Sequence, residues 1–146
     1  MKDPRIRLSK LLNEPIGIYD QDWEWVVSNS DRFRDYLKLY KLKYLTDKER
    51  NMLMEMMLQC VNDVRVEFGL IPKFWLEVKD ILNSDFHIHK KTIKYWASLN
   101  NFSCMLSDSW LISKEMRKVY WKNIANKASQ RDAVNCAPAG KRYANN

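Results

Sequence analysis

The stretch LTDKERNMLMEMMLQCVNDVRV, residues 45–66, decides the fold class of this 146-residue chain. Thr46, followed three residues later by Glu49, forms a capping-box pattern, in which the two residues satisfy each other's free backbone N–H groups at a helix start. A wide stripe of apolar residues then recurs at helical spacing: Leu53, Met54, Met57, Leu58, Cys60, Val61 and Val64. The stripe predicts a central helix packed on two sides, and Gly69 predicts where it ends.

Four further segments have helical periodicity around this central helix. They are residues 31–40 after a possible Ser-Asp cap, residues 72–82 opened by Pro72, residues 89–99, and residues 114–128 after a possible cap at Ser113. The chain has only 3 Gly and 4 Pro, so turn-forming residues are scarce. We therefore predict a mainly α fold, a compact single-domain bundle of about five helices.

Both ends of the chain are less regular. Residues 1–20 predict a short arm or a single helical turn, and the alternating run QDWEWVV, residues 21–27, predicts one short N-terminal strand. Beyond Ser129 the helical periodicity is lost. We therefore divide the chain into a helical domain, residues 1–128, and a mobile C-terminal tail, residues 129–146.

The charge balance favours an anionic partner without choosing its class. The net charge is +7, of which the last twenty residues supply +3 (four basic, one acidic) and the other 126 residues supply +4. The +4 is a mild excess and not the field of a nucleic-acid binder, and it is compatible with either an acidic protein or RNA as partner. Three cysteines without a CxxC spacing, no signal-peptide pattern and no long apolar run predict a cytoplasmic protein that does not cross a membrane.

The two histidines, His87 and His89, are the first candidates for a metal or catalytic site. In a helix, two residues of this spacing point about 200° apart, so they do not grip one metal ion, and zinc needs further ligands that the cysteine spacing does not supply. The simpler interpretation is a helix start near Asp85, with one imidazole partly buried. We predict no metal and no cofactor.

Other catalytic arrangements are also weak. Cys60 belongs to the core stripe, Cys104 lies in a predicted loop, and the carboxylates of Asp20, Asp22 and Glu24 form a cluster that is common on surfaces. Neither a Gly-rich phosphate loop nor a GxSxG or HExxH motif occurs. We therefore predict that the protein is not an enzyme.

Basic residues interleaved with aromatic residues give the best candidate for a binding surface. They lie on the exposed sides of the last two predicted helices: Lys90, Lys91, Lys94, Arg117, Lys118, Trp121 and Lys122. Such a surface suits a protein interface, where Trp and Arg are frequent anchors, or nucleic acid, through phosphate contacts and base stacking. A merely solvated face is the third interpretation.

A set of segments also resembles a known family. WEWVV, then FRDYLKLYKLKYLTDKERNMLMEMMLQCVNDV, then Trp75 to Leu82, HxxxIxYW at residues 89–96, and WLISxxMR at residues 110–117 before Trp121 resemble small helical immunity proteins of bacterial polymorphic toxin systems, of the contact-dependent growth inhibition and Rhs types. The similarity covers about residues 23–122. It departs from the family in charge, because immunity proteins against nuclease toxins are often acidic.

The resemblance implies a non-enzymatic cytoplasmic inhibitor that binds a cognate toxin domain, expected to be a nuclease, and covers its active site or blocks access of its substrate. With a net charge of +7, this chain would need a toxin with an acidic contact face, or an interface that is mainly apolar and polar. The residues alone leave an RNA- or DNA-binding helical module as the alternative, and they leave the oligomeric state open.

Overall fold

The computed structural model describes residues 3–15, 22–99 and 112–142, and for residues 133–142 it describes the backbone alone. These parts contain seven α-helices and one short 3-10 helix, and no strand occurs among them. The prediction of a mainly α chain is therefore confirmed. Each of the five predicted helices has a counterpart, and two short N-terminal helices raise the count. Cys104 and the predicted loop around it lie outside the described residues.

Helix α4 (Asp47–Phe68) is the centre of the fold, as its sequence predicts. The Glu49 backbone N–H donates to the Thr46 hydroxyl at 3.2 Å, and the Thr46 N–H donates to the Glu49 carboxylate at 2.8 Å, so the predicted capping box is present. Gly69 ends the helix with a φ of 69°, a left-handed conformation that favours glycine. Within the apolar stripe, every residue from Leu53 to Val61 is buried.

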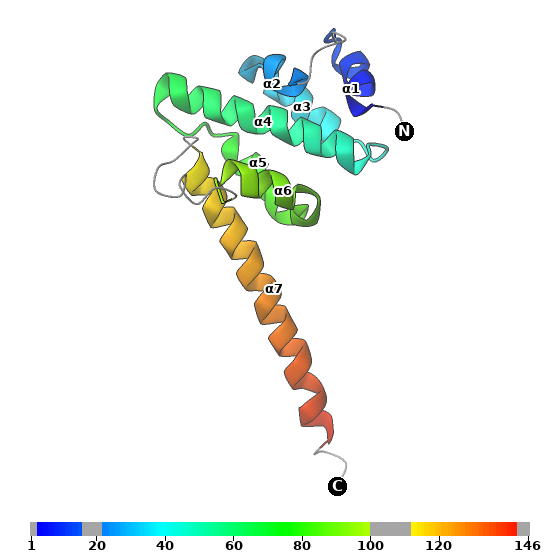
Figure 1. Ribbon diagram of the computed structural model, residues 1–146, viewed down its shortest axis with the longest axis vertical. Helices are drawn as coiled ribbons and strands as arrows, with labels where there is room; N and C mark the ends of the chain where they lie inside the picture. Colours follow the sequence, from blue (N-terminus) through cyan, green and yellow to red (C-terminus); the bar gives the residue numbers. More distant parts are fainter. Residues whose placement is uncertain (1–2, 16–21, 100–111, 143–146) are drawn as a thin grey trace.

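The other helices surround α4 in two layers. Helices α1 (Pro4–Leu12), α2 (Trp23–Val26) and α3 (Phe33–Tyr40) contact one side of α4, whereas α5 (Trp75–Ser84) and α6 (Phe86–Trp96) contact the other (Figure 1). Helix α7 (Ser113–Arg142) packs on α5 and α6, and its second half projects away from the other helices. This arrangement explains why α4 needs an apolar stripe wide enough for two sides.

The N-terminal region differs from its prediction, because the expected strand is the short helix α2. Trp23 is fully buried, and its indole Nε1 donates to the Pro15 carbonyl at 3.0 Å. The Val27 N–H donates to the Trp23 carbonyl at 3.0 Å, which closes a helical turn. The run has no neighbouring strand to pair with in the described residues, so its backbone groups are satisfied locally.

The boundaries of the predicted helices shift by a few residues. The 3-10 helix η1 (Ser30–Arg32) precedes α3, and Asn29 caps it by accepting from the Asp31 N–H at 2.9 Å. Helix α5 begins at Trp75, after a turn in which the Trp75 N–H donates to the Pro72 carbonyl at 3.0 Å. Helix α6 begins at Phe86, three residues before the predicted start, and ends at Trp96.

Helix α7 differs most from its prediction, because it continues to Arg142 across the predicted domain boundary at residue 128. The predicted domain boundary at residue 128 is therefore not the end of a helix. The mobility of the last residues stays a prediction. Ser113 is the first helical residue and not a separate cap. It is buried, and its hydroxyl donates to the Trp96 carbonyl at 2.7 Å, so it satisfies the end of α6.

No described helix has both the length and the apolar character needed to cross a membrane.

Candidate partner-binding surface

Both histidines lie on α6, but they occupy opposite environments. His89 is fully buried, whereas His87 is exposed, as the two-residue spacing predicts for a helix. The start of α6 has no side-chain cap, because the Asp85 carboxylate accepts from the Tyr40 hydroxyl at 2.7 Å. The same hydroxyl lies 2.7 Å from Nε2 of His89. Tyr40 therefore joins α3 to the start of α6.

These residues begin a line of hydrogen-bonded polar groups between α4 and α6, which we call the polar seam: Tyr40, Asn51, Glu55, Asp85, His89, Thr92 and Trp96. Nδ1 of His89 lies 3.1 Å from Oδ1 of Asn51, and the Thr92 hydroxyl donates to the same oxygen at 2.8 Å. Nε1 of Trp96 donates to the Glu55 carboxylate at 2.7 Å. The seam thus bonds one face of α6 to α4 over two to three turns.

Burial sets the protonation behaviour of the seam. It lowers the pKa of His89 to about 4, although the nearby Asp85 charge acts in the opposite direction. It raises the pKa of Glu55, while hydrogen bonds from Trp96 and Thr92 act against that rise. The His89 ring is therefore neutral near pH 7 and enclosed by its partners, an arrangement that fixes helix packing and offers no surface to a substrate.

Metal and nucleophile sites find no support in the parts of the chain that the structure describes. There, no group of three or more His, Cys, Asp or Glu residues could hold a metal ion. Cys60 is buried in the core, and burial raises the pKa of its thiol to about 12. A thiol of this kind behaves as a small apolar side chain and is a poor nucleophile.

The three predicted binding residues of α6 differ in their exposure and in their position relative to α7. Lys90 and Lys91 are exposed, and Lys94 is partly buried. Phe86 faces Tyr120 of α7, with ring centroids 6.1 Å apart. Because Lys90 lies one turn after Phe86, it is on the side of α6 that borders α7.

The four predicted residues of α7 have different roles. Arg117 is partly buried and donates from Nη1 to the Ala97 carbonyl at 3.2 Å, so it caps α6. Lys118 lies 3.4 Å from the Glu115 carboxylate, and both Lys118 and Lys122 are exposed. Trp121 is 55% exposed, and its ring meets Tyr120 edge to face at 5.0 Å. Trp121 is therefore the accessible aromatic residue of this surface.

The structure places the excess charge on one helix. The 30 residues of α7 include eight Lys or Arg and two Asp or Glu, a net charge of +6, whereas the other 116 residues include 17 basic and 16 acidic residues, a net charge of +1. Only a mild excess of positive charge was predicted from the sequence because residues 127–146 were counted separately, which divides the charge of this helix between two segments. As one element, α7 carries a concentrated positive field.

An exposed apolar group near the turn between α4 and α5 was missed by the sequence reasoning. Val66, Phe68, Leu70 and Leu76 are each 63–70% exposed. The sequence contains a signal for them, because Val66 and Phe68 are apolar but fall outside the stripe that ends at Val64. Single exposed apolar residues are common, and Val66 and Phe68, two residues apart on one helix, point to nearly opposite sides, so we assign no common surface to these four residues.

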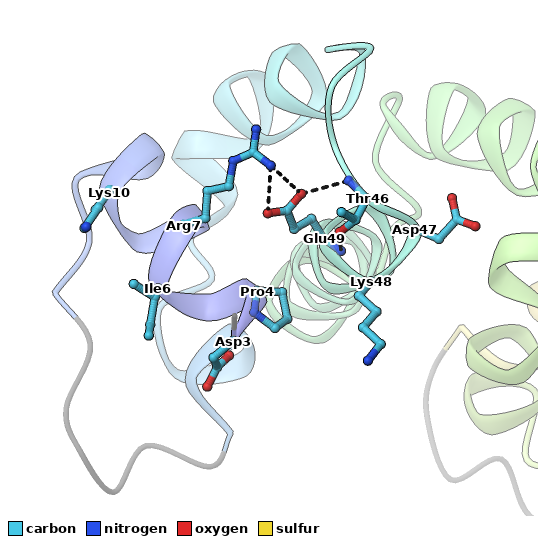
Figure 2. Close-up of a pocket in the computed structure, with 9 residues that line it drawn as sticks. All are labelled: Asp3, Pro4, Ile6, Arg7, Lys10, Thr46, Asp47, Lys48 and Glu49. Atoms are coloured by element: carbon cyan, nitrogen blue, oxygen red, sulfur yellow. Dashed lines mark hydrogen bonds and ion pairs between the residues drawn. The ribbon is translucent and has the colours of Figure 1, made fainter. Parts of the chain in front are cut away.

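A hollow of about 650 Å³ lies between α1 and the start of α4 (Figure 2). Its charged groups already bind one another, since Nη1 of Arg7 lies 3.3 Å from both carboxylate oxygens of Glu49. Glu49 and Thr46 are also bonded to each other in the capping box. The hollow therefore presents no unpaired buried charge that would recognise a ligand, and we assign none to it.

Comparisons with protein-family models, with curated proteins and with solved structures found no match for this chain. What the protein does is therefore inferred from its surface and from the pattern of its residues. The accessible Trp121, the cations near it and the charge of α7 are the features that need a function.

Proposed function

We propose that this protein is an immunity-type inhibitor, which binds a cognate bacterial toxin domain and blocks its active site or the access of its substrate. The observation that carries the proposal is the half-exposed Trp121 on α7, with Lys118 and Lys122 on the same helix and Lys90 at the border of α6. The resemblance of residues 23–122 to helical immunity proteins supplies the class of partner.

The environment of Trp121 suits an interface anchor. Its ring rests edge to face on Tyr120, and Tyr120 in turn packs against Phe86 of α6. A ring held by such a stack loses little side-chain entropy on binding, and rigid aromatic residues at the centre of an interface account for much of its affinity. The exposed lysines would act mainly on association rate and specificity, by attracting an acidic face of the toxin.

The interior supports binding over catalysis. Two core residues capable of acid–base or nucleophilic chemistry, His89 and Cys60, are inaccessible to solvent, and the Glu55 carboxylate is bonded to Trp96. The polar seam uses the His89 ring to hold α3, α4 and α6 together. An inhibitor needs this kind of rigid, well-ordered body, because a partner surface that is already in its bound shape costs less free energy to engage.

A rescue experiment tests the proposal. The toxic domain encoded immediately upstream is expressed in bacteria with and without this protein, and we expect growth to be restored and the two proteins to co-purify. Trp121→Ala should weaken the complex by at least about 2 kcal/mol, the usual size of an anchor effect.

Tyr44→Ala is the matched control, because Tyr44 is also 55% exposed but lies between α3 and α4. It should leave the affinity unchanged. Wild-type protein that neither restores growth nor co-purifies would rule the proposal out. Equal losses for the two variants would remove Trp121 as the anchor.

A further inference from the structure

The part of α7 beyond Trp121, residues 122–142, is a cationic arm with a chemistry unlike that of the Trp121 surface. Its sequence contains five basic residues and one acidic residue, Lys122, Lys127, Arg131, Lys141, Arg142 and Asp132, a net charge of +4. Every residue from Ala125 to Asp132 is exposed, whereas Asn123 and Ile124 still touch the other helices. The arm therefore meets solvent on all sides soon after it leaves the body.

The cations of the arm are available to a partner. Among the described residues, no ion pair is formed by Lys122, Lys127 or Arg131. Lys118, in contrast, is paired with Glu115. Lys127 lies 5.3 Å above the Phe86 ring, which orients its side chain, but the residue stays exposed. Lys127 and Arg131 are one turn apart and so lie on the same side of the helix.

Between Ala125 and Asp132, the arm lacks the large apolar side chains that a protein or membrane partner would need. Between Ala125 and Asp132 the residues with apolar side chains are alanines, so no aromatic or large aliphatic anchor is present. Protein interfaces bury such anchors at their centre and are depleted in charge there. Helices that lie in a membrane surface need a strong apolar face. Phosphate groups, in contrast, are bound by charge alone, without any apolar anchor.

The shape of the arm also fits nucleic acid. It projects from the body as a single straight helix, clear of the other helices (Figure 1). Residues 125–142 extend about 27 Å at about 1.5 Å per residue. A helix of about 10–12 Å diameter fits the major groove of duplex DNA, which is about 12 Å wide, and this would bring the side of the arm that carries Lys127 and Arg131 close to phosphates.

We propose that the cationic arm binds nucleic acid through its phosphate groups, as a second activity that does not depend on toxin binding. It recognises the charge of the phosphate backbone rather than a base sequence. Affinity should therefore vary little with sequence and fall steeply with salt.

Binding is measured by fluorescence anisotropy with two fluorescein-labelled probes. One is a 20-base-pair DNA, and the other is a single-stranded RNA with the sequence of one strand of that DNA. The full-length protein is compared with the double variant Lys127→Glu/Arg131→Glu. We expect wild-type binding near 50 mM salt to weaken at least tenfold in the variant. The slope of log K against log salt should decrease in magnitude by about 2, close to one unit for each lost phosphate contact.

The matched control is Lys41→Glu/Lys43→Glu, because both lysines are exposed, lie between α3 and α4, and give the same change of net charge. The control should bind within about threefold of wild type. Helicity is compared by circular dichroism, and if the arm variant loses helix, Lys127→Gln/Arg131→Gln takes its place with the same expected direction.

Three results would overturn the assignment. They are no binding to either nucleic acid near 50 mM salt, an equal loss in the arm and control variants, and tighter binding to polyglutamate than to DNA or RNA. The last result would assign the arm to an acidic protein. If the protein fails to rescue cells from the toxin but still binds DNA or RNA, the proposed inhibitor function is wrong and the assignment of the arm is unaffected.

Discussion

Acidification should destabilise this protein through a single buried group, the imidazole of His89. The pKa of His89 is lowered from 6.5 to about 4 because the ring is buried between Tyr40, Asn51 and Thr92. The unfolded chain therefore binds a proton at a higher pH than the folded chain does. The stabilising contribution is complete above about pH 6.5 and is lost as the pH falls through the window from 6.5 to 4.

The magnitude follows from the two pKa values. A difference of about 2.5 between them corresponds to about 3 kcal/mol lost below pH 4, and to about 2 kcal/mol already lost at about pH 5. The charged groups around the ring act in both directions. Asp85 and Asp47 raise the pKa of His89, whereas His87 and Arg50 lower it, and burial, the largest cause, also lowers it.

Equilibrium urea unfolding at about pH 7.5 and about pH 5 measures the effect in wild type and in His89→Gln, which cannot titrate. Wild type should lose about 2 kcal/mol more than the variant between the two conditions. His87→Gln is the control, because His87 is exposed and on the same helix, and it should keep the wild-type pH dependence.

Glu55 makes the comparison with His89→Gln necessary. Burial raises its pKa, so its folded form binds a proton more readily and its contribution to stability falls as pH rises. This opposes the His89 effect, but it is common to wild type and variant. Equal pH dependence in wild type and His89→Gln, or an NMR titration of the His89 ring with a midpoint near 6.5, would show that the reasoning about its burial is wrong.

Four substitutions test other parts of the structure. Thr46→Ala removes the hydroxyl of the capping box and should lower the free energy of unfolding by about 1 kcal/mol in urea, with Thr46→Ser as the control; an unchanged value would mean that the cap is not limiting. Met57→Ala opens a cavity at a fully buried position of α4 and should cost about 2–5 kcal/mol, and a cost below about 1 kcal/mol would contradict its central place. Tyr40→Phe leaves Asp85 and His89 without their shared hydroxyl and should cost about 1–3 kcal/mol by the same assay; a neutral result would show that the two groups find other partners. Trp121→Ala should change stability by less than about 0.5 kcal/mol, so that any loss of toxin binding reflects the surface; a larger change would mean that the ring supports the fold.

The central helix was predictable because its signals are local. The capping box of Thr46 and Glu49, the apolar stripe and the stop at Gly69 all lie within one stretch of sequence, and the structure has each of them. Short helices are different. Trp23–Val26 contains only four residues, too few to reveal a helical period, and alternation over such a length also fits a strand.

The polar seam was not predictable, because its partners are far apart in sequence. Tyr40 and His89 are separated by 49 residues, and Asn51 and Thr92 by 41. The sequence indicated that one histidine would be buried, but the groups that satisfy it become neighbours only when α3, α4 and α6 pack. Long-range hydrogen bonds of this kind leave no periodic pattern in the chain.

The continuation of α7 was missed for a different physical reason. Periodicity of apolar residues detects a helix by the face that it buries, and every residue of this helix from Ala125 to Asp132 is exposed. The segment beyond Ile124 mixes good helix formers, such as Ala128, Gln130 and Arg131, with poor ones, Pro138 and Gly140, so propensity did not indicate a helix either. The candidate binding residues lie on α6 and α7, but Lys94 and Arg117 are partly buried, and Arg117 also caps α6.

The position of the charge on α7 makes its outer half electrostatically independent of the body. At physiological salt an exposed charge is screened over about 8 Å, whereas the arm extends about 27 Å beyond Ile124. The charges of the rest of the chain, which total +3 against +4 for the arm, are therefore hardly felt at the far end of the helix. Changes to the surface of the body would leave the field of the arm intact, so the two regions are free to change separately while the chain keeps one fold.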